Sequence, residues 1–203
     1  MRSLRRPVAR ALLLVLVLGV IAAPPVAAGA PTDQLKTQID RVLKALEDPE
    51  LKKEGRAKER RTAVRKIAND IFDFGETARR SLGPHWQTRT PAERDEFVQL
   101  FSDLLERSYI SKVELYGGEK IQYLGDSVET DQAKVMTKLL TKNGSEIPIE
   151  YRMHNKGGRW LVYDVIIEGV SLVANYRTQF NKIIRTSSYQ ELVKKMKAKQ
   201  EEL

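Results

Sequence analysis

The sequence predicts an α+β domain in which helices pack on one curved antiparallel sheet. Helical spacing of apolar residues runs from Thr32 to Tyr109, and helical spacing returns after Ser171. Between Glu119 and Ile167 the pattern changes to the apolar and polar alternation of strands. Because these strands follow one another directly, we expect a meander of about four strands with N-terminal and C-terminal helices packed on it.

Residues 1–28 have the three-part layout of a secretory signal peptide. Four arginines precede the apolar run 11–23, and Val26-Ala27-Ala28 offers a cleavage site of small residues. A retained membrane anchor is the alternative, but a full span needs roughly 20 apolar residues and this run is interrupted by Pro24-Pro25. We therefore expect cleavage and a single exported domain over residues 29–203. The chain contains no Cys, which excludes an N-terminal lipid anchor on Cys and any disulfide.

The net charge argues against nucleic-acid binding. The whole chain carries +8, but four of its 35 basic residues lie in the leader, so 31 basic and 27 acidic residues remain and the mature charge is +4. Such a mild excess, without a dense basic stripe, does not fit a nucleic-acid interface. Lysines do gather at residues 194–199, where a solvated helix face is the simplest interpretation and contact with an acidic partner or an anionic membrane is the alternative.

Three helices are expected before residue 90. The first covers Thr32–Leu46, and the charged stretch over residues 48–61 is either a solvated connection or the start of the second. The second pattern continues through Phe72 and Phe74 and closes near Gly75. A short third helix is expected from Glu76 to Gly83-Pro84.

A long helix should begin after Thr90. Thr90 suits the N-cap, Pro91 the first helical position and Glu93 the third, which together form a capping box. Apolar residues then recur on one broad face until Gly117-Gly118 ends the helix.

Two turns define the central strands. Asn143-Gly144 is a signal for a two-residue hairpin, and Lys156-Gly157-Gly158 marks the next turn. On the strand between them Ile147, Ile149, Tyr151 and Met153 share one face, because side chains alternate along a strand.

The strand that follows, residues 160–167, is apolar on both faces. Alternation places Tyr163, Val165 and Ile167 on one side and Val162 and Ile166 on the other. Ser171 then suits the N-cap of a helix whose apolar stripe packs back on the sheet. This pattern fits an ordinary filled core and equally fits a cavity between sheet and helices.

Catalytic and metal-binding patterns are weak. Neither His85 nor His154 has other ligand-type residues at metal-site spacing, so no metal and no catalytic cofactor are expected. Asp164 is the one acid inside the apolar strand and could serve as the general base of a small exported isomerase or hydrolase. The simpler interpretation is that Asp164 accepts hydrogen bonds from backbone amides or a helix terminus.

The chain also resembles a known family over most of its mature length, from about Thr32 to Lys197. The matching residues are Phe72-Asp73-Phe74, Ala78-Arg79-Arg80-Ser81-Leu82-Gly83, Trp86, Thr90-Pro91-Ala92-Glu93-Arg94, Phe97, Leu105, Trp160, Val162-Tyr163-Asp164-Val165, Glu168-Gly169-Val170-Ser171-Leu172, Asn175-Tyr176-Arg177 and Phe180. They are similar to the toluene-tolerance, or organic-solvent-resistance, auxiliary family, also called the MlaC family.

The resemblance implies a carrier and not an enzyme. Its members are NTF2-like, hold phospholipid acyl chains in an apolar cavity and act in the periplasm. They exchange lipid between an outer-membrane lipoprotein complex and an inner-membrane MCE-type ABC transporter, so phospholipid is cargo and no cofactor is implied. Transport direction, head-group preference, the number of chains held, a hopanoid-related cargo, docking surfaces and oligomeric state are left open.

For the walls of such a cavity, strand parity and helical spacing select thirteen residues. They are Phe97, Phe101, Leu104 and Tyr109 from the long helix, Ile147, Ile149 and Tyr151 from the hairpin, Tyr163, Val165 and Ile167 from the apolar strand, and Leu172, Tyr176 and Phe180 from the helix that follows.

Overall fold

The structure is a computed structural model that describes residues 30–201; the expected signal peptide lies outside these residues. Within them, no helix combines the length and the hydropathy that a membrane span requires. The helices are α1 (Ala30–Glu47), α2 (Ala57–Ile71), α3 (Phe74–Leu82), the 3₁₀ turn η1 (Gly83–Trp86), α4 (Pro91–Glu114), α5 (Leu172–Thr186) and α6 (Tyr189–Glu201). The strands are β1 (Lys120–Glu129), β2 (Gln132–Leu140), β3 (Glu146–Lys156), β4 (Arg159–Ile167) and β5 (Val170–Ser171).

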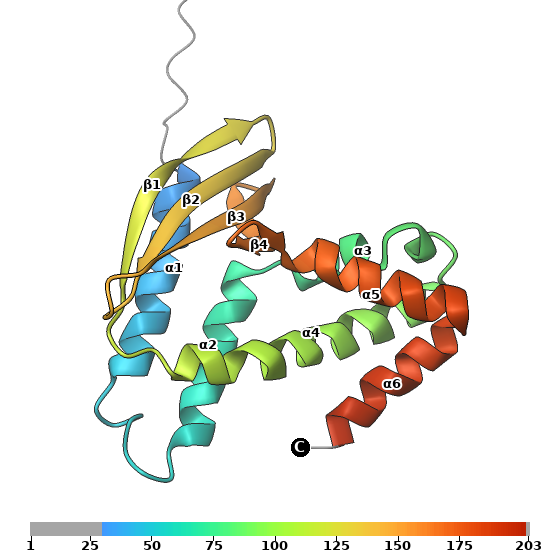
Figure 1. The fold of residues 1–203 in the computed structure, drawn as a ribbon, viewed down its shortest axis with the longest axis horizontal. Helices are drawn as coiled ribbons and strands as arrows, with labels where there is room; N and C mark the ends of the chain where they lie inside the picture. Colours follow the sequence, from blue (N-terminus) through green and yellow to red (C-terminus); the bar gives the residue numbers. More distant parts are fainter. Residues whose placement is uncertain (1–29, 202–203) are drawn as a thin grey trace, which may run out of the picture.

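The strands form one antiparallel sheet in the order β1-β2-β3-β4-β5. This confirms the predicted α+β class and meander, with the two-residue β5 as an addition to the four expected strands. Figure 1 shows the curved sheet at one side of the molecule with α1 against it, and α3, α5 and α6 at the other side, while α4 runs from α5 and α6 across the molecule to α2. The molecule therefore has a sheet half, formed by the sheet with α1 and α2, and a helical half, formed by α3 to α6.

The inner face of the sheet is closed at one end by α1 and α2. We call Ala133, Val135, Met153 and Val162 the covered end, because these neighbouring residues are only 3%, 0%, 1% and 0% exposed. They pack against Leu35 of α1 and against Ile67 and Ile71 of α2. Burial of a Val or Met side chain contributes roughly 1.5–3 kcal/mol, so the covered end is a main source of stability for the sheet half.

The same face is less covered at its other end. Leu139 pairs with Ile147, and Ile149 pairs with Ile167, which places these four residues on the face that carries Val135. We call them the open end, because three are only partly buried and Ile167 is 39% exposed.

A separate aromatic core holds the helical half together. Phe97 and Phe101 of α4 stack at 5.8 Å between ring centroids, and both meet the edge of Phe180 of α5. Tyr189 of α6 joins this core, with its ring 6.4 Å from that of Phe97. α4 starts with the predicted capping box, since the Thr90 hydroxyl accepts from the Glu93 N–H and the Glu93 carboxylate accepts from the Thr90 N–H.

The second helix ends earlier than its apolar pattern predicts. α2 stops at Ile71, and Phe72 is extended, with ψ of 141°, and forms a parallel bridge to Val162. Asp73 then caps α3 by accepting from the Glu76 N–H at 2.9 Å, so α3 starts at Phe74 and not at Glu76. The apolar spacing predicted too long a helix because Phe72, in an extended segment beside β4, continues the helical spacing of α2.

The turn at Asn143-Gly144 is also longer than the predicted two-residue hairpin. The Thr141 N–H donates to the Ser145 carbonyl, which leaves three residues in the turn. Gly144 has φ of +83°, a left-handed conformation that glycine adopts without strain.

A bulge in β4 overturns the predicted parity at Tyr163. Arg152 of β3 pairs with Asp164 and the next residue, Met153, pairs with Val162, so Tyr163 is an extra residue in β4. Val162 and Val165 consequently share the inner face. The Tyr163 ring lies instead beside His154 and beneath the Arg80 guanidinium, which is 3.9 Å from the ring centroid.

Candidate functional site

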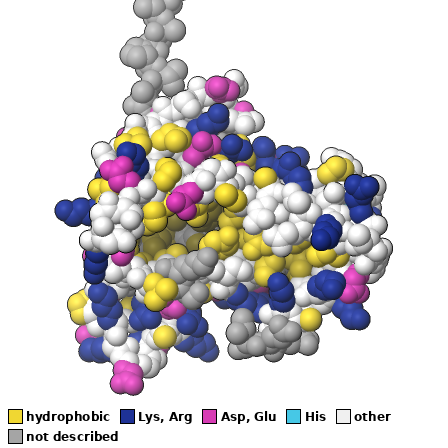
Figure 2. Space-filling model, viewed as in Figure 1, with side chains coloured by type: hydrophobic (Ala, Val, Ile, Leu, Met, Phe, Trp, Pro, Cys, Tyr) yellow, Lys and Arg dark blue, Asp and Glu magenta, His cyan; other side chains and the backbone are white. Residues whose placement is uncertain are grey.

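A hollow lies between the sheet half and the helical half. Figure 2 shows it near the middle of the view, lined largely by hydrophobic side chains, and comparison with Figure 1 places it beside β4, α4 and the start of α5. From the hollow, hydrophobic side chains continue towards the region of α4 and α5. An exposed apolar surface of this kind favours an apolar ligand or partner.

The helical residues selected from the sequence fall into two groups. Phe97, Phe101 and Phe180 are at most 4% exposed and form the aromatic core itself. Leu104, Tyr109, Leu172 and Tyr176 are only partly buried and pack at the border of that core. The second group therefore keeps part of its side-chain surface accessible beside the core.

Most of the selected strand residues lie together on the inner face. Ile147 and Ile149 belong to the open end, and Tyr151 pairs with Val165 in the next row towards the covered end. Ile167 continues the row of Ile149. Tyr163 is the exception, because the bulge directs it towards Arg80 and His154.

Sequence reasoning missed residues of β1 and β2 on the same face. Tyr123 pairs with Thr137, which pairs with Ile149, so a polar pair continues the row that ends at Ile167. The alternation of side chains along β1 and β2 predicts these strands, and the same alternation could have identified Tyr123 and Thr137 as residues of the inner face.

Tyrosine hydroxyls around the inner face and the helix border are poorly hydrated. Burial raises the pKa of Tyr151 to about 12, against a small opposing effect of the Thr137 hydroxyl. Burial also raises the pKa of Tyr109, with a smaller contribution from the neighbouring Tyr176. These neutral hydroxyls add polar points to surroundings that are otherwise apolar.

Asp164 has a structural role in the fold. Its side chain is buried, with Oδ2 accepting from the Ser171 hydroxyl at 2.6 Å and Oδ1 accepting from the Val173 N–H at 3.0 Å. Arg152 Nη1 lies 3.7 Å from Oδ2. The Ser171 hydroxyl in turn accepts from the Ala174 N–H, which confirms Ser171 as the N-cap of α5. Asp164 therefore positions α5 on the sheet, as the simpler interpretation predicted.

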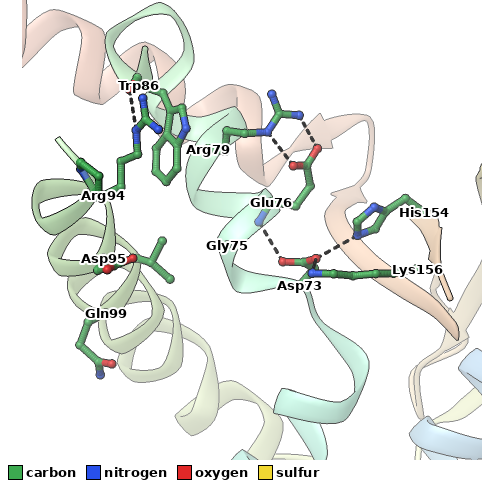
Figure 3. Close-up of a pocket in the computed structure, with 12 residues that line it drawn as sticks. Asp73, Gly75, Glu76, Arg79, Trp86, Arg94, Asp95, Gln99, His154 and Lys156 are labelled. Carbon is green, nitrogen blue, oxygen red and sulfur yellow. Dashed lines mark hydrogen bonds and ion pairs between the residues drawn. The ribbon is translucent and has the colours of Figure 1, made fainter. Parts of the chain in front are cut away.

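A second, polar pocket of about 660 Å³ lies between α3, the first turns of α4 and the end of β3 (Figure 3). Asp73 accepts from His154 Nε2 at 3.1 Å and from Lys156 Nζ at 3.2 Å. Glu76 accepts two hydrogen bonds from Arg79, at 2.7 and 2.6 Å. The residues that line this polar pocket are Asp73, Gly75, Glu76, Arg79, Trp86, Pro91, Arg94, Asp95, Val98, Gln99, His154 and Lys156.

Hydrogen bonds and ion pairs keep Asp73 and Glu76 of this pocket ionised. Burial alone would raise the pKa of Asp73, but the Glu76 N–H, Lys156 and His154 outweigh burial and lower it. Hydrogen bonds from Arg79, together with Arg80, lower the pKa of Glu76 to about 2.

The polar pocket does not support hydrolysis by a nucleophile. The Asp73–His154 pair could orient an imidazole, but the twelve lining residues drawn in Figure 3 include no Ser, Thr, Cys or Tyr that it could activate. Among the described residues, no group of three His, Cys, Asp or Glu side chains could hold a metal ion. The charged lining of the polar pocket is also unsuitable for a hydrocarbon chain.

Comparison with known proteins gives the same family for almost the whole described chain. The family described as MlaC protein matches residues 36–198. The intermembrane phospholipid transport system binding protein MlaC of Haemophilus influenzae is 24% identical over 141 residues, which are 67% of this chain and 66% of that protein. Toluene tolerance protein ttg2D of Pseudomonas putida is 25% identical over 126 residues, 58% of this chain and 56% of that protein. The matches thus span somewhat less than two thirds of these relatives.

A solved structure has the same fold. The phospholipid-binding protein from Ralstonia solanacearum, determined in complex with a phospholipid, superposes with a TM-score of 0.73. It is 24% identical in sequence, and the match covers 82% of this chain and 94% of that one. With the family match over residues 36–198, these findings confirm the resemblance read from the motifs: the chain belongs to the MlaC family.

Proposed function

We propose that this protein is a periplasmic carrier that binds phospholipid in the hollow between its two halves. The observation that carries the proposal is the open end of the inner sheet face, where apolar residues are only partly covered, in a molecule with an apolar hollow on its surface. The names of the relatives support phospholipid as the cargo.

The physical reason for a hollow is the cost of moving acyl chains through water. Each methylene transferred from water to an apolar surface contributes roughly 0.8 kcal/mol, so a chain of ordinary length cannot cross an aqueous space unshielded. The partly buried residues at the open end and on α4 and α5 gain contacts when a chain lies against them. The walls we propose are Leu104, Tyr109, Ile147, Ile149, Tyr151, Val165, Ile167, Leu172 and Tyr176, with Phe97, Phe101 and Phe180 supporting them from the aromatic core.

We further propose that the carrier exchanges lipid between an inner-membrane MCE-type ABC transporter and an outer-membrane lipoprotein complex. The family membership supports this assignment, as does the description of one relative as part of an intermembrane transport system. A predicted signal peptide over residues 1–28 and a chain without Cys fit a carrier released into the periplasm.

Native mass spectrometry tests the binding proposal directly. Residues 29–203, exported in a bacterial host and purified without detergent, should carry phospholipid in stoichiometric amount, and organic extraction should remove it. An apo mass that persists after incubation with phospholipid vesicles would contradict the proposal.

A matched pair of variants locates the binding surface. Ile167 and Met136 are 39% and 40% exposed, but the register places Ile167 on the inner face and Met136, opposite Glu150, on the outer face. Ile167→Glu should lower lipid occupancy roughly tenfold or more, because a carboxylate beside an acyl chain must be desolvated, while Met136→Glu should bind as the parent does. Equal occupancy in both variants would refute the placement of the walls.

Asp164→Asn separates the carrier from the alternative of an Asp164-dependent isomerase or hydrolase. A carrier should keep its lipid in this variant, provided that the fold is retained, since Asp164 is occupied in holding α5. Turnover of a small substrate by the parent that disappears in the variant would favour the enzyme.

A further inference from the structure

Ion pairs join the two halves where α2 passes α4. α2 belongs to the sheet half through Ile67 and Ile71, whereas α4 belongs to the aromatic core of the helical half. The carboxylate of Glu114, the last residue of α4, forms ion pairs with Arg60 Nη2 at 3.2 Å and with Arg61 Nε at 3.1 Å. We call these three residues, with the pair of Arg65 and Glu106 further along the same two helices, the brace.

Part of the brace is more sheltered than the nearby ion pair of Arg56 and Glu59, although the side chains of Arg61 and Arg65 are 54% and 57% exposed. The Glu114 side chain is 11% exposed and that of Arg60 is 20% exposed. The nearby pair of Arg56 and Glu59 has side chains that are 52% and 50% exposed. Because Glu114 and Arg60 are partly buried, their attraction should be stronger than that of an ordinary surface pair. The exposed side chains of Arg61 and Arg65 leave the rest of the brace open to screening by salt.

The position of Glu114 at the end of α4 also requires that cations pair with it. A carboxylate at the C-terminal end of a helix is repelled by the helix dipole, so Glu114 is unfavourable there unless cations face it. Two arginines do so, and Arg60 is itself fixed by a hydrogen bond to the Leu51 carbonyl at 3.0 Å. Glu114 thus ties the end of α4 to both α2 and the connection before it.

We propose that Glu114 is a positioning residue for lipid exchange: through Arg60 and Arg61 it holds the helical half against the sheet half and limits how readily the hollow opens. This rests on the proposed lipid-binding function. Parting the two halves beside the hollow breaks the brace, so the rate of lipid exchange should rise with ionic strength as the Debye length falls from about 10 Å at 0.1 M to about 3 Å at 1 M salt.

The test compares Glu114→Gln with Glu59→Gln, which removes the same charge from a neighbouring pair within one half. Protein loaded with fluorescent phosphatidylethanolamine is mixed with acceptor vesicles of phosphatidylcholine, and transfer is followed at several salt concentrations. Glu114→Gln should release lipid roughly fivefold faster at low salt and lose most of the salt dependence, because the screened interaction is gone. Glu59→Gln should match the parent. A parental rate and salt dependence in Glu114→Gln would overturn the proposal.

A second measurement does not depend on lipid. The chain has no Cys, so spin labels can be placed on Lys58→Cys and Leu115→Cys alone, and Leu115 is 81% exposed. The distance between α2 and the end of α4 should become longer or more broadly distributed when Glu114→Gln is added. An unchanged distribution counts against the brace, and this reading stands even if the parent binds no phospholipid, a result that would refute the carrier function itself.

Discussion

The two ends of the inner sheet face carry similar residues but differ in what covers them. Met153 of the covered end is 1% exposed, whereas Ile147, six residues earlier on the same strand and face, is only partly buried. α1 and α2 pack on the first end, and we propose that the second borders the hollow. The difference teaches that a strand pattern selects a face, while the placement of helices decides whether that face becomes core or a site for a ligand.

The largest effect should come from a charge at the covered end. Val135→Glu places a carboxylate where the side chain is fully buried between α1, α2 and the sheet, and we expect a loss of more than about 4 kcal/mol in the free energy of unfolding. Urea denaturation with circular dichroism measures it. Lys134→Glu, one residue away on the exposed face, is the control and should change stability by less than about 0.5 kcal/mol. A soluble Val135→Glu variant of parental stability would show that the covered end is not a closed core.

Truncation of a side chain to Ala should destabilise the protein more at the covered end than at the open end, by less than the charge of Val135→Glu does. Met153→Ala should cost about 2–5 kcal/mol, because it leaves a cavity in a packed region. Ile147→Ala should cost less than about 1 kcal/mol in lipid-free protein, because its side chain is incompletely covered.

The difference between the stability costs of Met153→Ala and Ile147→Ala should become smaller once phospholipid is bound. In loaded protein an acyl chain covers the open end, so Ile147→Ala should then lose additional stability while the cost of Met153→Ala stays the same. Urea titrations of both variants with and without phospholipid decide this. Equal costs for Ile147→Ala in the two states would mean that lipid does not reach the open end.

Periodicity was sufficient to predict the architecture and much of the inner face. The shared face of Ile147, Ile149, Tyr151 and Met153 is confirmed by their partners on β2 and β4. The start of α4 at Thr90 and the cap of α5 at Ser171 are also confirmed, because capping depends on residues within one turn.

Apart from the local turn at Asn143-Gly144, the predictions that failed depended on contacts distant in sequence. The bulge that turns Tyr163 away arises from the pairing of β4 with β3, and the early end of α2 arises because Phe72 bridges to Val162. Neither is encoded in local spacing. For the same reason the sequence could not distinguish Phe97, which is core, from Leu104 and Tyr109 on the same helix, which lie at the core border.

Acid should loosen the helical half before the covered end. Glu76 of α3 has a pKa lowered from 4.5 to about 2 by its hydrogen bonds to Arg79 and Arg80. Since its folded pKa lies below the unfolded value, its contribution is fully present above about pH 4.5 and is lost as the pH falls towards 2. After allowance for solvent screening, we expect a loss of about 2 kcal/mol over this range.

The two tryptophans can report the halves separately. Trp86 packs against the aromatic core and Trp160 against the cluster of the covered end. In Trp160→Phe protein, Trp86 fluorescence should change at a higher pH than Trp160 fluorescence does in Trp86→Phe protein. Glu76→Gln should weaken the acid dependence of the first signal. Coincident transitions in both proteins would indicate that the two halves unfold as one unit.

A small effect should come from the cap of α5, and it tests how independent the covered end is. The Ser171 hydroxyl accepts from the Ala174 N–H and donates to Asp164, so Ser171→Ala should cost about 1 kcal/mol, and Ser171→Thr should restore most of it. Hydrogen exchange should show faster exchange in the first turns of α5, which carry Leu172 and Tyr176, with the amides of β2 unaffected. Loss of protection in β2 as well would mean that the covered end depends on the helical half. In that case the hollow could not open without loosening the core, and a carrier built this way would have to unfold in part whenever it releases its lipid.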